Sequence, residues 1–158
     1  MKNKHHAGFS LIELLIVVAI IGIIAAIAIP NLLASRRAAN EGSAQSSMRT
    51  ISSCEAAYKH TYGNGDYTDL ATLGAKVMTD QVLTSGTKSG YLFTAAPDAA
   101  DPQTFFSTAF PITTSGIAQT GTRRFGLTED GVLRGDADLA SGAPADHPGV
   151  VALPAMAN

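Results

Sequence analysis

The stretch Gly8-Phe9-Ser10-Leu11-Ile12-Glu13-Leu14-Leu15 opens an apolar run that extends to Ile29, and the rest of the chain is organised around it. From Leu14 to Ile29, sixteen consecutive residues carry neither a charge nor a hydrogen-bonding side chain. As a helix, the segment that begins at Phe9 is roughly 30 Å long, which matches the hydrocarbon core of a bilayer. Lys2 and Lys4 precede it, so we expect one membrane-spanning helix with a cytoplasmic N-terminus.

Glu13 is the residue that does not fit a simple membrane anchor. A carboxylate at the centre of a bilayer costs about 2.5–3.5 kcal/mol on insertion scales, and less near a helix end. Three interpretations are open. The side chain can snorkel to the head groups, or it can favour the positive end of the helix dipole, which is worth about 0.3–1 kcal/mol. Alternatively, cleavage after Gly8 would give Phe9 a free amine that pairs with Glu13 of another subunit.

The segment from Lys4 to Glu13, followed by the apolar run to Pro30, resembles the N-terminus of type IV pilins and the related pseudopilins. The shared features are a short basic leader, the Gly8-Phe9 junction, a glutamate at the fifth position beyond Gly8 and a proline after the run. The resemblance implies cleavage between Gly8 and Phe9 by a prepilin peptidase, N-methylation of Phe9, and a role for Glu13 in subunit assembly. Because the cut would precede the apolar segment, this leader differs from a secretory signal peptide.

The same resemblance implies an α+β, type IV pilin-like fold, in which a long N-terminal helix packs against a small antiparallel sheet. We expect four parts: a leader over residues 1–8, a transmembrane and polymerisation half of the helix over 9–30, an amphipathic half over 31–62, and a β-sheet head with an irregular tail over 63–158. The expected precursor lies in the inner membrane, and the expected partners are other copies in a helical filament, the peptidase and an inner-membrane assembly platform.

The function that the resemblance implies is structural: a pilin of a surface filament, with no enzymatic activity and no cofactor. A pseudopilin of type II secretion is the alternative within the same class. A membrane-anchored periplasmic binding or enzymatic domain is the alternative from another class. A net charge of −2 and 11 Lys and Arg residues give no basis for nucleic-acid binding. The single cysteine, Cys54, excludes a disulfide within one chain, and we expect a half-buried structural thiol.

Beyond the apolar run, the sequence predicts that the helix continues. Pro30 removes a hydrogen bond and Gly22 loosens the helix, so both are expected at a kink or a locally melted turn. Good helix formers follow, and a stripe at intervals of three and four residues predicts the face that packs on the sheet. The stripe comprises Ala44, Met48, Ile51, Glu55, Tyr58 and Tyr62. Gly63-Asn64-Gly65 then predicts the end of the helix near Tyr62.

The remaining sequence predicts short helices and four strands. Residues 69–73 are expected to form a helical turn that stops before Gly74, and residues 80–83 a further turn. Alternation and flanking turn residues predict strands over 90–95, 104–110, 123–128 and 132–134, the last two joined by a turn at Asp130-Gly131. Residues 138–158 are rich in Ala, Gly and Pro, so an irregular tail is expected.

Two patterns suggest other chemistry and carry little weight. Ser85-Gly86-Thr87-Lys88 matches the S-x-x-K of serine acylases, but the S-D-N and K-T-G motifs that accompany it there are missing. Glu129, Asp130, Asp136 and Asp138 supply clustered oxygens, and pseudopilins carry a calcium site in a C-terminal loop. Their spacing does not follow a calcium-loop pattern, so we expect a solvated turn and no metal. His5, His6 and His147 show no ligand spacing beyond adjacency.

Overall fold

The computed structural model describes residues 9–156, and it divides into two compact units, Met1–Ser35 and Arg36–Asn158, each of which is considered by itself. One helix, α1 (Leu11–Thr61), supplies nearly all described residues of the first unit and the first element of the second. It continues through Pro30, as the run of helix formers after that residue predicts.

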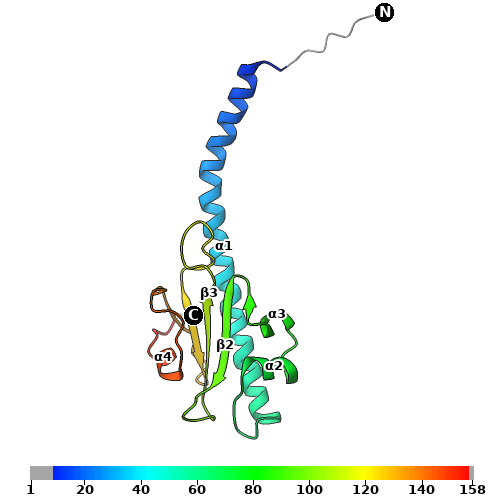
Figure 1. Cartoon of the computed structure of the whole chain (residues 1–158), viewed down its shortest axis with the longest axis vertical. Helices are drawn as coiled ribbons and strands as arrows, with labels where there is room; N and C mark the ends of the chain where they lie inside the picture. Colours follow the sequence, from blue (N-terminus) through cyan, green and yellow to red (C-terminus); the bar gives the residue numbers. More distant parts are fainter. Residues whose placement is uncertain (1–8, 157–158) are drawn as a thin grey trace, which may run out of the picture. The chain divides into compact units, whose positions relative to one another are not determined.

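In the second unit, α1 is followed by two short helices and a five-stranded sheet (Figure 1). The helices are α2 (Leu70–Lys76) and α3 (Gln81–Thr84). The strands are β1 (Thr87–Lys88), β2 (Tyr91–Pro97), β3 (Phe105–Pro111), β4 (Arg124–Thr128) and β5 (Arg134–Asp136), in that order across the sheet, and each pairs antiparallel with its neighbours. A last short helix, α4 (His147–Val151), follows β5. The expected α+β, pilin-like fold is confirmed.

The core lies between α1 and one face of the sheet. Ala44, Met48 and Ile51 of α1 are fully buried there. Alternation along the strands places Tyr91, Phe93 and Ala95 of β2 on the same side, with Leu92 facing away. The stripe on α1 ends at Tyr58, which is partly buried against the core. Tyr62 was expected at the helix–sheet interface, but it is 54% exposed and lies outside that interface.

A second apolar contact covers the other face of the sheet. Val150 of α4 and Leu153 just after it are buried, although neither belongs to the main core. An added Cβ at Gly126 of β4 would lie 2.7 Å from Val150 Cγ1, so the glycine allows the close approach of α4. The tail also pairs with β5 through Arg134 and Ala155. The expectation of an irregular tail was therefore wrong in part.

Three further details differ from the sequence prediction. Helix α2 passes through Gly74, where an added Cβ would lie 2.0 Å from Thr84 Cγ2. This glycine permits contact between α2 and α3 and does not end the helix. Strand β5 begins at Arg134 and not at Val132, since the turn after Thr128 is longer than two residues. The two-residue strand β1 was not predicted.

Candidate functional site

The N-terminus of α1 is closed by a reciprocal pair of hydrogen bonds. Ser10 is the first residue outside the helix, and its Oγ accepts from the backbone N–H of Ile12 at 3.2 Å. In return, Glu13 Oε2 accepts from the Ser10 N–H at 2.8 Å. This is the capping box of a Ser-x-x-Glu sequence, which satisfies backbone donors that have no partner within the helix.

The capping box gives Glu13 a role within its own chain, which the sequence reasoning missed although the Ser10-x-x-Glu13 spacing was visible. The helix dipole also favours a negative charge at this position. Glu13 nevertheless remains exposed, and so does Phe9, whose side chain is 85% exposed. Gly8, the other half of the expected cleavage junction, lies outside the described residues.

The apolar run presents side chains in every direction, and none of its most apolar 18-residue window is buried within the chain. Leu14, Ile21 and Ile27 are each about 60% exposed. A helix that is apolar all round needs an apolar environment, either lipid or other helices. By length and composition α1 is long and apolar enough to cross a membrane.

A side-chain hydrogen bond lies beside Pro30 but does not replace the one that proline removes, which would go to the Ala26 carbonyl. Proline has no N–H to donate, so the helix loses one backbone hydrogen bond there. The side-chain amide of the next residue, Asn31, donates to the carbonyl of Ile27 at 3.1 Å. At Gly22, nothing lies within 4 Å of an added Cβ, so no contact within the chain requires a glycine. The proposed flexibility at these two positions stays a prediction.

Glu55 is the charged residue of the buried α1 stripe. Its side chain is fully buried, Oε2 accepts from the Thr68 N–H at 3.2 Å, and Oε1 is buried with no hydrogen-bond partner. Burial raises the pKa of this carboxyl to about 7, the Thr68 hydrogen bond opposes that rise, and the charge of Asp69 adds to it. Burial also raises the pKa of the neighbouring Cys54 thiol, which argues against a reactive cysteine.

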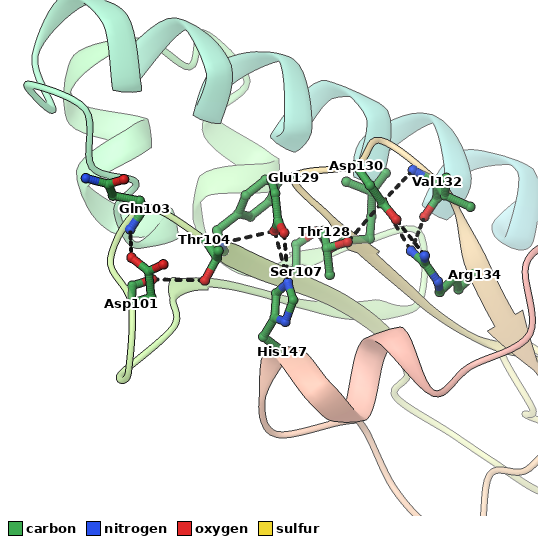
Figure 2. A network of polar contacts seen from close by, with 12 residues as sticks. Asp101, Gln103, Thr104, Ser107, Thr128, Glu129, Asp130, Val132, Arg134 and His147 are labelled. Carbon is green, nitrogen blue, oxygen red and sulfur yellow. Dashed lines mark hydrogen bonds and ion pairs between the residues drawn. The ribbon is translucent and has the colours of Figure 1, made fainter.

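The acidic residues near the β4–β5 turn have partners within the protein (Figure 2). Glu129 contacts His147 of α4 at 3.0 Å, and Asp130 pairs with Arg134, whose hydrogen bond lowers the pKa of Asp130 to about 2. Asp136 binds Arg124 Nε at 2.7 Å, and Asp138 Oδ2 lies 3.6 Å from Arg124 Nη2. Within residues 9–156, no three His, Cys, Asp or Glu side chains come together as a metal site.

The S-x-x-K residues do not meet either. The Ser85 hydroxyl donates to the carbonyl of Val82 at 2.7 Å, whereas the Lys88 ammonium pairs with Asp80 at 2.6 Å. A serine nucleophile needs a base within hydrogen-bond reach, and Lys88 is committed elsewhere. Within the described part of the chain, the candidate functional site is therefore the N-terminal segment, which combines an exposed apolar surface with a glutamate that caps the helix.

A comparison with protein families matches this segment. Residues 3–29 match the family model of the prokaryotic N-terminal methylation motif. The chain is 63% identical over 41 residues to the type IV wide pilus major component PilA4 of Thermus thermophilus, and 47% identical over 49 residues to the type IV major pilin protein PilA of Myxococcus xanthus. These matches cover 26% and 31% of this chain, and only 30% and 22% of the two relatives. No solved structure gives a significant match.

Proposed function

We propose that this chain, which carries the type IV prepilin methylation motif, is a pilin: a structural subunit that polymerises through its N-terminal helix into a surface filament. The observation that carries the proposal is the helix from Leu14 to Ile29, apolar on all sides and unburied within its own chain. Outside the bilayer these side chains would face water, and burying one large aliphatic side chain against neighbouring subunits contributes about 1.5–3 kcal/mol relative to that exposure, which stabilises the emerged filament.

The subunit is first a membrane protein. Lys2 and Lys4 favour a cytoplasmic N-terminus, and the head from Arg36 onward then lies on the opposite side of the inner membrane. A prepilin peptidase cuts between Gly8 and Phe9 and methylates the new Phe9 amine. An assembly platform in the membrane then adds subunits to the filament. One relative is named a major component of a type IV wide pilus and the other a type IV major pilin, which favours a pilus over a type II secretion pseudopilus.

Glu13 sets the register of assembly in this proposal. In the dry interior of a filament, its carboxylate requires a cation, and the amine of Phe9 from a neighbouring subunit supplies one. An unpaired charge in such surroundings costs several kcal/mol, so a subunit in the wrong axial position is disfavoured. The capping bond to Ser10 holds the carboxylate at the helix N-terminus, where the incoming amine can reach it.

Three variants separate pairing from capping. Glu13→Gln retains an oxygen that can accept from the Ser10 N–H but removes the charge, whereas Ser10→Ala weakens the cap by about 0.5–2 kcal/mol and keeps the charge. Glu13→Ala removes both. We expect few filaments from either Glu13 variant and near-normal filaments from Ser10→Ala, since assembly depends on the charge and most of the helix stability comes from its surroundings.

The assay counts filaments by electron microscopy, after mass spectrometry has shown that each variant is cut after Gly8. Gly8→Val serves as the unprocessed control and is expected to leave full-length chain in the membrane. Normal filament numbers from Glu13→Gln would refute the ion pair and leave apolar packing alone. Absence of filaments from the wild-type chain and its partners together would refute the pilin function itself.

A further inference from the structure

Residues 112–122 of the connection between β3 and β4, called here the 112–122 loop, are fastened to the beginning of α1 in the second unit. Asn40 Nδ2 donates to the Thr120 carbonyl at 2.8 Å. Glu41 Oε1 accepts from both the N–H and the hydroxyl of Thr122, each at 2.7 Å. Within the loop, the Thr120 N–H donates to the Thr113 carbonyl at 3.0 Å. The loop is thus held beside the part of α1 through which this unit joins the apolar helix (Figure 1).

The 112–122 loop is uncharged and exposes two isoleucines among threonine, serine, glutamine and glycine residues. Ile117 is 79% exposed at its tip and Ile112 is 57% exposed at its base. No residue from Ile112 to Thr122 is charged. Single exposed apolar residues are common on protein surfaces. Two exposed isoleucines in one short, anchored loop favour an apolar partner, and the proposed membrane would supply one.

Two exposed arginines lie close in sequence to the loop or to its anchor on α1. Arg123 follows it directly and is exposed, and Arg36 is exposed at the start of the unit. Arg37 is half-buried, and its Nε has no hydrogen-bond partner. The acid on this part of α1, Glu41, is already bound to Thr122. This arrangement of apolar tip and flanking arginines complements a lipid surface, in which phosphates lie above the acyl chains.

The chain between the apolar run and the residues of α1 that anchor the loop is short. Arg36 comes seven residues after Ile29 and Asn40 eleven, which as helix correspond to roughly 10 and 16 Å. The three residues from Thr120 to Ile117 can extend back by up to about 10 Å. A head that lies against the membrane would therefore bring the loop tip within reach of the interfacial layer.

We propose that the 112–122 loop is a lipid-docking element that holds the head of the unassembled subunit against the membrane. Ile117 and Ile112 enter the interfacial layer, while Arg36 and Arg123 contact lipid phosphates. The occupant of this surface is thus a phospholipid bilayer, and a second copy of the chain is the competing outcome. The inference rests on the membrane residence in the proposed function, and incorporation into a filament would withdraw the loop from the lipid.

The chain contains no tryptophan, so a single introduced one reports on its surroundings without background. The test uses the full chain in vesicles of phosphatidylethanolamine and phosphatidylglycerol, with lipids brominated on the acyl chains as quenchers. Ile117→Trp is the reporter. Val132→Trp is the matched control, because Val132 is 38% exposed in the β4–β5 turn, at the opposite end of β3 and β4 from the loop.

We expect Trp emission from the Ile117→Trp chain to shift to the blue and to be quenched by the brominated lipid, as for an interfacial tryptophan. The Val132→Trp chain should show neither effect. Adding Arg123→Gln to the reporter, or replacing phosphatidylglycerol by phosphatidylcholine, should reduce the quenching. The result should not change when the protein is diluted to less than one chain per vesicle.

Equal emission and equal quenching of the two reporters would overturn the inference. A blue shift without lipid quenching that disappears on dilution would also overturn it, and would assign the loop to contact between copies. Flotation of the vesicles separates this inference from the proposed function. If the chain floats but the Ile117→Trp reporter is unquenched, only lipid docking fails. If the chain does not float with the vesicles, membrane residence fails as well.

Discussion

Replacement of the buried Glu55 by glutamine should stabilise the head at neutral and alkaline pH and leave it unchanged in acid. One carboxylate oxygen of Glu55 accepts from the Thr68 N–H, and the other is buried without a partner. Glutamine keeps the shape and the acceptor, and it removes the charge. Because the protonated acid and the amide are alike in both respects, the variant mimics the form that burial favours.

The magnitude follows from the pKa of about 7 in the folded head, compared with the ordinary value of 4.5 for the unfolded chain. Between these two pH values the folded state holds a proton that the unfolded state has lost, so the free energy of unfolding falls as pH rises. At about 1.4 kcal/mol per pH unit, the loss reaches about 3 kcal/mol and is complete above pH 7.

The assay is urea unfolding of the compact unit Arg36–Asn158, followed by near-ultraviolet circular dichroism at a series of pH values from 4.5 to 8. Other groups, such as Asp130 with its pKa lowered to about 2, titrate in both proteins and cancel in the difference. The two stabilities should coincide at the acid end and diverge in favour of Glu55→Gln toward pH 7. Parallel curves, or a variant that is less stable than wild type at pH 8, would refute the reasoning.

Two further predictions concern packing in the same fragment, which should be soluble because it lacks the apolar run. Ile51→Asp should unfold the fragment, since an unpaired charge would enter the core at a cost of about 4 kcal/mol or more. Tyr62→Ser, on the exposed end of α1, should cost about 1 kcal/mol or less. Equal melting temperatures of the two variants would refute the assigned packing face. Gly74→Ala should lower the melting temperature, because the new methyl group would clash with Thr84. Helix propensity alone predicts the opposite, a gain of about 1 kcal/mol in stability. Adding Thr84→Ala to this variant should recover part of the lost stability.

The sequence was sufficient for the long helix, its buried stripe as far as Tyr58, and the positions of the main strands. These features depend on periodicity, which a single chain displays directly. Gly74 was misread because its function is a contact with Thr84, ten residues away, and no local pattern shows that contact. Strand β1, with only two residues, offers no alternation to detect.

The tail and the acidic turn were harder for a related reason. Composition alone cannot show that Val150 would be buried on the outer face of the sheet, since its partner Gly126 is distant in the chain. Likewise, a cluster of acids has the same sequence whether it binds a metal, water or arginines. Arg124, which binds Asp136 and donates to the Gly142 carbonyl, resolves that choice only once the strands are paired.

Glu13 and Glu55 show how one residue type on one helix can serve opposite purposes. Each carboxylate accepts one backbone N–H, at 2.8 and 3.2 Å. Glu13 is exposed at a capped helix N-terminus, where the dipole favours the charge, so the charge remains available to another chain. Glu55 is enclosed by its own chain, where burial disfavours the charge and leaves only shape and one hydrogen bond in use. Glutamine should therefore disrupt assembly at position 13 and stabilise the head at position 55.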